Sequence, residues 1–340
     1  TLDFASSLTD ADYTKAMGSF RALQELAVIY DWCFPELPES ESDEWIDEVH
    51  RLADLGPGAY PLSQQSSFLI GHHVSIFTSA FAAALAIADE DSSMWDDGVP
   101  VLFEQTLPNR HFFYPSGGHH QGNYRGYYNY ELLLELLFSK LHDTNRTLFD
   151  PAGRMIQYEL LYNMRPDQLP LRRGDLSDHA GIYNAFLFTT VLSTHGQGVS
   201  DPYLQNLLDI DKFRESNSTV RAGIDVLKFV FYDPEFEASP LEELPEVYYI
   251  APPLGGRYIA RTGWDISGDK ASATALVEME IGNYFWGGHD HRGRMGTFQI
   301  YYRGNLTSPR GNYQTSTSGF GSSHWYAFYT QSVSRNALLI

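Results

Sequence analysis

Apolar residues recur at a spacing near 3.6 through the first two-thirds of the chain, which predicts helices rather than strands. Residues 10–33 show this period clearly, and Pro35 and Pro38 end it. Residues 66–88 are apolar almost all round, as is typical of a helix buried between others. The other predicted helices are 42–55, 93–106, 127–142, 151–164, 177–193, 202–208 and 220–230. Joined by loops of moderate length, they indicate a bundle or toroid of helical hairpins.

The pattern changes near Asp233, where residues 233–246 are acidic and interrupted by prolines, as in a linker. Alternating or aromatic-rich runs after it predict strands. These runs are 247–250, 258–261, 273–279, 297–302 and 325–329. Helices followed by strands favour segregated parts: a helical domain over 1–232 and an antiparallel β domain over 247–340. Since about 90 residues make a thin sheet domain, we expect further C-terminal chain or completion of the sheet elsewhere.

Composition limits the class of protein. The chain is 43% hydrophobic and 14% aromatic, too rich in both for a disordered protein. Its single cysteine, Cys33, excludes a disulfide within the chain. No apolar run reaches about 18 residues, so no membrane insertion is expected. The first four residues lack the basic and apolar regions of a signal peptide, which fits a cytosolic chain or one already trimmed.

The charge is strongly acidic and unevenly distributed. A net charge of −20 predicts repulsion from nucleic acid and anionic membranes unless the charges are segregated. Residues 251–340 carry eight basic and five acidic side chains, a net +3, whereas the other 250 carry 15 and 38, a net −23. The C-terminal part could therefore meet an anionic ligand. The alternative is that the acidic helical surface only keeps the chain soluble.

Histidines gather in three Gly-containing segments: 71–73, 119–128 and 287–294. The first lies in an otherwise apolar helix, and because burying unpaired imidazole is unfavourable, the pair His72 and His73 needs polar partners or a cavity. The last contains His289 and His291, a spacing that puts both rings on one face of a strand and suits a metal only with a third ligand. The alternative interpretation is structural, with the many tyrosines and single histidines filling the core.

The segment 286–304 resembles the signature of the heparinase II/III-like polysaccharide lyases, in which an H-x-H-x-D-x-G-x-F segment enters a strand. Residues 258–265 resemble the R-[ST]-x-W strand of that family. Residues 29–32, 71–73 and 120–125 follow in the family's order, so the resemblance spans nearly the whole chain. It implies an incomplete (α/α) toroid followed by antiparallel β-sheet, and a lyase that cleaves uronate-containing anionic polysaccharides by β-elimination.

The resemblance also implies site residues. The family uses a helix-borne His, a Tyr from the next helical hairpin and the first His of the H-x-H segment. In this chain the catalytic residues would be His72 or His73, Tyr124 or Tyr128, and His289. Arginines could pair with a substrate carboxylate or sulfate. The residues expected to bind substrate are Gln121, Asn123, Arg125, Arg292 and Arg294.

A metal is not required for this chemistry, although many family members hold a structural ion. Of the expected ligands only His291 is present, as a candidate for a zinc or calcium ion. The strand that follows, 306–311, lacks the Asp, and Arg335 stands where a late His is expected before Asn336. The usual metal site is therefore not expected to be complete.

Three other functions remain open from the sequence. A uronyl C5-epimerase shares the proton abstraction but returns the proton. An inverting glycoside hydrolase on an (α/α) toroid needs two carboxylates about 6.5–9.5 Å apart. A lyase relative could bind glycans without catalysis. A polymeric substrate of this kind is met outside the cytoplasm, which predicts a secreted or periplasmic protein.

Overall fold

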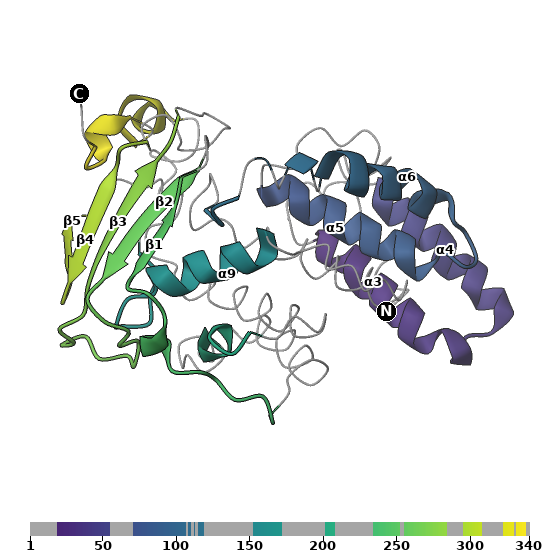
Figure 1. Cartoon of the computed structure of the whole chain (residues 1–340). Coiled ribbons are helices and arrows are strands. Elements are labelled where there is room, and N and C mark those ends of the chain that lie inside the picture. The colour runs from purple at the N-terminus through teal and green to yellow at the C-terminus, as the bar shows by residue number, and fades with distance from the viewer. Residues whose placement is uncertain are drawn as a thin grey trace. The chain divides into compact units, whose positions relative to one another are not determined.

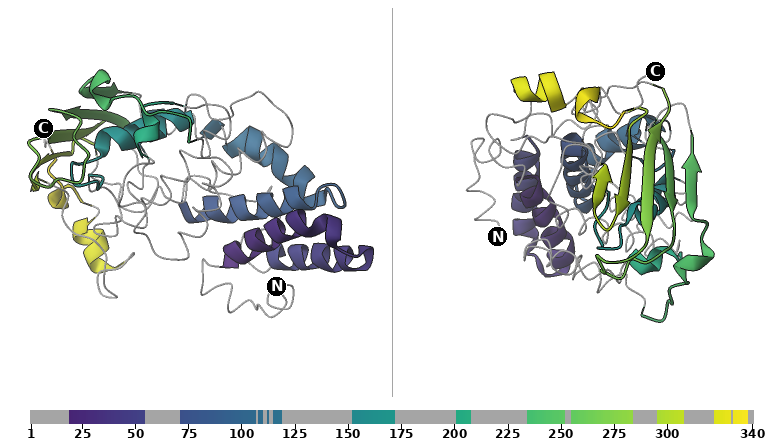
Figure 2. Two further views of the ribbon diagram at one scale, coloured as in Figure 1. Left: turned by 90° about the horizontal axis from the view of Figure 1, so that it is seen from below. Right: turned by 90° about the vertical axis from the view of Figure 1, so that its left-hand side faces the viewer.

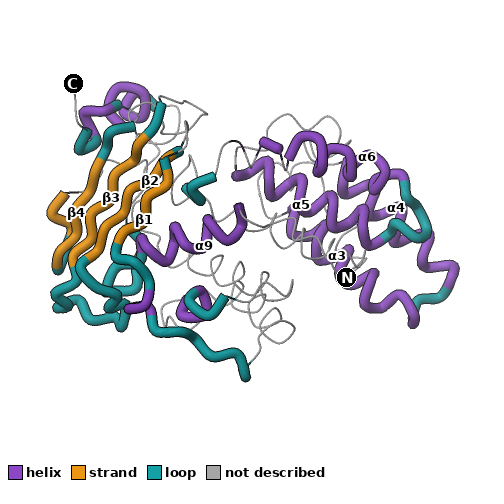
Figure 3. The backbone as a smooth tube through the Cα atoms, in the orientation of Figure 1, coloured by secondary structure: helices purple, strands orange, loops and turns teal. Residues whose placement is uncertain are grey.

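The structure is a computed structural model of the 340-residue chain. It describes residues 19–54, 71–106, 108–109, 112, 115–118, 152–171, 201–207, 234–251, 255–283, 295–307, 322–329 and 331–337. The chain divides into two compact units, Thr1–Asn109 and Arg110–Ile340. Described helices dominate the first unit, and the second contains the sheet (Figure 3). Residues 233–246 were predicted to separate a helical domain from a sheet domain, and this domain boundary stays a prediction.

The first unit is built from helices that match the predicted periods. They are α3 (Ser19–Cys33), η1 (Phe34–Glu36), α4 (Glu39–Asp54), α5 (Gly71–Ala86), α6 (Ser93–Val101) and the π-helical turn η3 (Leu102–Thr106). Helix α5 packs against α3 and α6, and α4 packs against α3 (Figure 1). Residues 79–84 are all buried, which confirms for this part of α5 the prediction of a helix enclosed by others. None of the described helices is long and apolar enough to cross a membrane.

Asp91 ties together the turn between α5 and α6. Its Oδ1 accepts a hydrogen bond from the Ser93 amide at 2.9 Å, beside the start of α6. Its Oδ2 lies 2.9 Å from Nε2 of His50 on α4. These contacts, the bonds from Ser93 first, lower the pKa of Asp91 to about 2. The carboxylate thereby links α4 to the first turn of α6.

This carboxylate predicts an acid-sensitive contribution to stability. The folded-state pKa lies below the usual value of about 3.9, so the contribution is present above about pH 4 and is lost as the pH falls toward 2. The difference in melting temperature between the wild type and Asp91→Asn should therefore shrink as the pH is lowered from 5 to 2. Asp89→Asn, at an exposed neighbour, is the control. A difference that stays constant over this range contradicts the assignment.

The second unit contains a five-stranded antiparallel sheet in the order β1-β2-β3-β4-β5 (Figure 2). Its strands are β1 (Val247–Ile250), β2 (Gly256–Arg261), β3 (Ala275–Ile281), β4 (Phe298–Tyr302) and β5 (Asn305–Thr307). The helical elements are α9 (Ala152–Asn163), η5 (Leu204–Leu207), η6 (Leu241–Glu243), η7 (Trp325–Tyr329) and η8 (Ser332–Ser334). This confirms the predicted antiparallel sheet, although in the predicted helix 202–208 the described residues form only the 3-10 turn Leu204–Leu207. The helices predicted at 127–142, 177–193 and 220–230 lie outside the described residues, so the toroid stays a prediction.

The sheet has two unlike faces. Helix α9 lies against one face, where it contacts β2 (Figure 1). On that face Ile259, Leu276 and Tyr301 are buried together with several charged side chains. The opposite phase of the same strands is apolar and only half-buried: Tyr258, Met279 and Phe298 stand in register there on β2, β3 and β4. The more polar face of this sheet is thus the one that the helix covers.

The segment 325–329 corrects a prediction, since the expected strand is a helical turn. Its aromatic composition favours strands, but of its four described side chains only Trp325 is buried. Ser322 starts the turn: its Oγ accepts from the Trp325 amide at 3.1 Å, and its carbonyl accepts from the Tyr326 amide at 3.0 Å. A serine that satisfies the first free amides is a helix-initiating signal, and it outweighs the strand propensity of the residues that follow.

Candidate functional site

The residues predicted to act chemically fall unevenly on the described structure. His72 and His73 lie in the first turn of α5, in the first unit. The remaining predicted site residues lie outside the described residues: Gln121, Asn123, Tyr124, Arg125, Tyr128, His289, His291, Arg292 and Arg294. The described residues next to them show where in the second unit the segment 119–128 begins, and where the segment 284–294 begins and ends. The convergence of all the predicted side chains stays a prediction.

The segment 284–294 starts and ends at one end of the sheet. It leaves from β3 and returns to β4, which pair in antiparallel register. The Glu280 amide donates to the Thr297 carbonyl at 2.9 Å, and the Gly296 amide donates to the Glu280 carbonyl at 2.8 Å. The two flanks of the segment are therefore held side by side.

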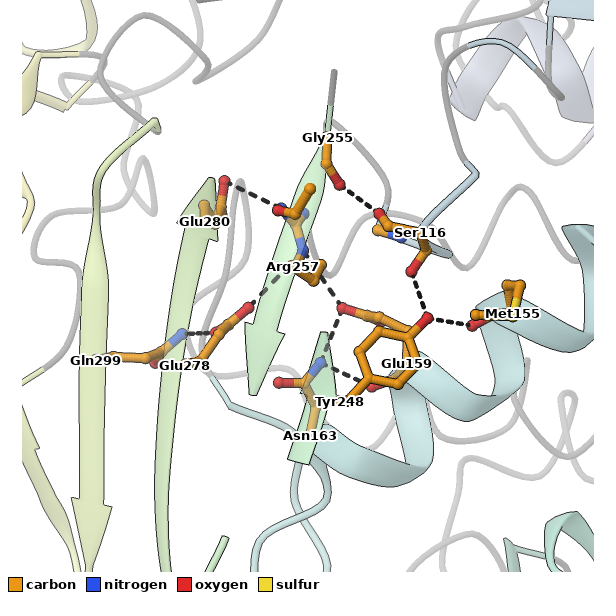
Figure 4. A network of polar contacts seen from close by, with 12 residues as sticks. Ser116, Met155, Glu159, Asn163, Tyr248, Gly255, Arg257, Glu278, Glu280 and Gln299 are labelled. Carbon is orange, nitrogen blue, oxygen red and sulfur yellow. Dashed lines mark hydrogen bonds and ion pairs between the residues drawn. The ribbon is translucent and has the colours of Figure 1, made fainter. Parts of the chain in front are cut away.

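The segment 119–128 begins at the same end of the sheet. Residues 115–118, just before it, are fixed to β1 and β2 (Figure 4). The Ser116 hydroxyl donates to the carbonyl of Gly255, beside the first residue of β2. The Tyr248 hydroxyl donates to the Ser116 carbonyl at 2.8 Å. Since Gly256 pairs with Ile281, the last residue of β3, the beginning of one segment lies beside the base of the other.

The C-terminal part of the chain also reaches this end of the sheet. Ala337 forms an antiparallel bridge with Thr297, and the Phe298 amide donates to the Asn336 carbonyl at 3.0 Å. Arg335 therefore lies close to the residues that follow the segment 284–294. It is the residue that stands where the family resemblance would place a histidine metal ligand. Among the described residues, no group of three or more His, Cys, Asp and Glu side chains is arranged to hold a metal ion.

A buried arginine lies beside the described residues that flank these segments. Arg257 on β2 is 1% exposed. Its guanidinium lies 3.5 Å from a carboxylate oxygen of Glu159 on α9, 3.5 Å from Glu280 and 3.9 Å from Glu278 on β3 (Figure 4). We call these four residues the Arg257 cluster. Gln299 on β4 extends it by donating to Glu278, and Asn163 extends it by donating to Glu159 at 2.8 Å.

The Arg257 cluster is suited to holding structure rather than to contacting substrate. Glu159, Glu278 and Glu280 are 0%, 1% and 6% exposed. Buried charges of this kind are retained when they are paired and hydrogen-bonded. The cluster joins α9, β2 and β3 next to the described residues that flank the two segments, so it can fix the positions of those residues. Its carboxylates are too buried to be accessible to a polymer.

A second buried arginine explains part of the sequence resemblance. Arg261 donates to the carbonyls of Leu161 and Tyr162 at 3.3 Å, at the end of α9, and lies 4.2 Å from the ring centre of Trp264. A cation that satisfies free carbonyls at a helix C-terminus is favourable. Burial lowers the pKa of Arg261 to about 10, so it remains protonated at neutral pH. The Arg261–Trp264 motif therefore docks α9 on the sheet.

The sequence reasoning missed the Arg257 cluster. It counted Arg257, Arg261 and Arg335 as charges that could meet an anionic ligand, but they are 1%, 3% and 9% exposed. A signal was present: the charged residues of β2 and β3 share one phase of the alternation, opposite a phase that is entirely apolar. Two facing rows of opposite charge in adjacent strands indicate a paired, buried cluster as readily as a solvent-exposed face.

Comparisons with known proteins give structural matches alone. Neither the profiles of known protein families nor the curated protein sequences match this chain. A solved structure described as heparinase III matches with a TM-score of 0.58 and 13% identity, over 94% of this chain and 44% of its own. The heparan sulfate lyase HepC from Pedobacter heparinus matches with a TM-score of 0.56 and 16% identity, over 93% and 44%. The chain thus spans less than half the length of these structures, and it is similar in fold, at a distance, to heparin and heparan sulfate lyases.

Proposed function

We propose that the chain forms the helical and sheet parts of a polysaccharide lyase that cleaves a uronate-containing anionic polymer by β-elimination. The observation that carries the proposal is the shared origin of the two segments: 119–128 and 284–294 begin beside each other at one end of the sheet. The distant likeness in fold to heparin and heparan sulfate lyases supports it.

The reaction requires three groups. The charge of the uronate carboxylate opposes carbanion formation at C5, so a neutralising group must bind it. A base removes the C5 proton, the electron pair forms the C4–C5 double bond, and the C4–O4 bond breaks. An acid then protonates the departing O4. The products are a new 4,5-unsaturated uronate end and a hydroxyl on the leaving sugar.

The two segments contain the side-chain types that these steps need. His289 and one of Tyr124 or Tyr128 are the proposed base and acid, and His72 or His73 the group at the carboxylate. A free Tyr has a pKa of about 10 and a free His about 6.5. A phenol therefore donates a proton to O4 without assistance, but needs a neighbouring cation such as Arg125 to act as base. Arg292 and Arg294 are proposed to bind carboxylate or sulfate groups.

We propose that the protein meets its polymer outside the cytoplasm, in the periplasm or after secretion.

An overall charge of −20 does not attract polyanions in general. Binding therefore relies on local cations, and the proposed arginines lie in the same segments as the proposed catalytic residues. A cation is thereby available at the reacting uronate itself.

Incubation with a panel of acidic polysaccharides tests the function. We expect the ultraviolet absorbance of a 4,5-unsaturated uronate to rise with one polymer of a panel containing heparan sulfate, alginate, hyaluronan, chondroitin and an ulvan-like polymer. Heparan sulfate comes first because the structures similar in fold are named for it or for heparin. Deuterium incorporation at C5 without absorbance would instead indicate an epimerase, new reducing ends without absorbance a hydrolase, and binding alone a non-catalytic protein.

A further inference from the structure

The backbone at Gly118 lies directly on the guanidinium of Arg257. A Cβ atom added to Gly118 would lie 2.5, 2.6 and 2.7 Å from Nε, Cζ and Nη2 of Arg257, whereas real Cβ contacts essentially never fall under 3.0 Å. Only a residue without a side chain allows so close an approach. Gly118 is also the last described residue before the segment 119–128.

The guanidinium cannot easily move away from Gly118. It is 1% exposed, and Glu159, Glu278 and Glu280 surround it from α9 and β3. Its Nη1 also donates to the Gly256 carbonyl at 3.1 Å. Displacing a buried cation from its carboxylates is strongly unfavourable, so Arg257 offers a fixed surface on which the backbone at Gly118 rests.

The same guanidinium also contacts Glu280, which binds the residues that follow the segment 284–294. Glu280, 3.5 Å from Nη1, uses its backbone amide and carbonyl to hold Thr297 and Gly296. These are the residues that return the chain to β4 after 284–294. Arg257 therefore contacts Gly118, the residue before one segment, directly, and Gly296 and Thr297, which follow the other, through Glu280 alone.

We infer that Arg257 is a positioning residue, which sets through Gly118 and Glu280 the relative placement of the described residues that precede the Tyr-bearing segment 119–128 and follow the His-bearing segment 284–294. This inference rests on the proposed function for its effect on catalysis, but not for its effect on the two segments. A misplacement of about 1 Å at a catalytic group lowers a rate by about a hundredfold. A shift at the base of either segment should therefore slow the chemical step more than it weakens binding.

The variant Gly118→Ala tests this inference, because the new Cβ must move away from Arg257 by roughly half an ångström. We expect kcat to fall about tenfold or more, while KM changes less than about threefold. The control is Gly263→Ala, at the other end of β2, whose Cβ would meet Thr274 Oγ1 at 3.3 Å. That variant should leave kcat within about twofold of the wild type, because it requires a shift of only a few tenths of an ångström at Thr274, away from the Arg257 cluster.

Hydrogen exchange gives a readout that does not need activity. In Gly118→Ala we expect faster amide exchange in peptides from both segments, including 284–294, which Gly118 does not precede. Faster exchange in 119–128 alone, or an unchanged kcat in an active enzyme, would overturn the inference. If the wild type produces no unsaturated product on any polymer, the proposed function fails and the exchange result alone decides the positioning role.

A milder variant covers the case in which Gly118→Ala does not fold. Tyr248→Phe removes the hydroxyl that donates to Ser116, but leaves the four residues of the Arg257 cluster unchanged. Because Arg257 still holds Glu280, we expect faster exchange in 119–128 and little change in 284–294, with kcat lowered more than KM is raised. Unchanged exchange in 119–128, or equally faster exchange in 284–294, would contradict the inference.

Discussion

Replacing Arg257 by Met is expected to lower the free energy of unfolding of the second unit by about 3–5 kcal/mol. The reason is the charge that remains. Glu159, Glu278 and Glu280 are at most 6% exposed, and without the guanidinium they face one another in a buried space. Methionine fills similar volume, so the loss arises from uncompensated charge rather than from a cavity. For a unit of this size, about 3–5 kcal/mol corresponds to a melting temperature lower by roughly 6–20 °C.

Urea denaturation measures this change, and hydrogen exchange of peptides from 255–283 assigns it to the second unit. Lys270→Met is the control, because it removes a positive charge from an exposed position of the same unit and should change stability by less than about 0.5 kcal/mol. Adding Glu159→Gln to Arg257→Met should restore part of the loss by removing one of the three carboxylates. A loss as small as that of the control, or no recovery in the double variant, contradicts the account of the Arg257 cluster.

The strands of the sheet could be predicted, but not which of their faces is covered. The alternating or aromatic-rich runs place 247–250 as a strand with the bounds that the structure has, and 258–261 and 297–302 within a residue or two of theirs. Charged side chains usually face water. In β2 and β3 the charged phase is the buried one, because Arg257 and Arg261 find carboxylates and helix carbonyls on α9. Such partners come from distant sequence, so a strand's own pattern does not show them.

The helices that were predicted correctly are those in which apolar residues recur at helical spacing over a long stretch of sequence. The period over 66–88 contains α5, and that over 151–164 contains α9 within a residue or so at each end. The short aromatic run 325–329 was predicted wrongly because five residues offer too little period to distinguish helix from strand. There a single serine before the run determines the outcome.

The candidate site could be predicted as a set of residue types, while its support could not. The sequence shows His, Tyr and Arg gathered in Gly-flanked segments, and the structure places the residues before 119–128 and on both sides of 284–294 at one end of the sheet. The support consists of Ser116, Gly118 and the Arg257 cluster, whose members are far apart in the sequence. Gly118 belongs to the run Ser116-Gly117-Gly118, and only the close approach of Arg257 explains why a side chain is excluded there.

Replacing His289 by Ala is expected to lower kcat of the proposed lyase by about 10²–10⁴-fold, the usual contribution of a positioned acid or base. KM should change little, because the imidazole is proposed to move a proton in the transition state rather than to bind the sugar in the ground state. Production of the unsaturated uronate, measured by absorbance at saturating polymer, gives kcat directly. The control is His324→Ala: this residue comes directly before the turn η7, and its ring centre is 5.4 Å from that of Phe328.

The phenol that pairs with His289 can be identified in the same assay. Tyr124→Phe and Tyr128→Phe each remove one hydroxyl and little else, so the variant that loses about 10²-fold or more in kcat identifies the acid or base. Its partner should stay within about threefold of the wild type. The pH profile then separates the roles, because a Tyr acting as base requires a lowered pKa and gives a rising limb below its usual value of about 10. If His289→Ala and both Tyr variants still form the unsaturated uronate at the wild-type rate, the elimination does not depend on these side chains, and their assignment as catalytic residues is wrong. If the wild type forms only new reducing ends and all three variants keep that activity, the enzyme is instead a hydrolase that uses two carboxylates.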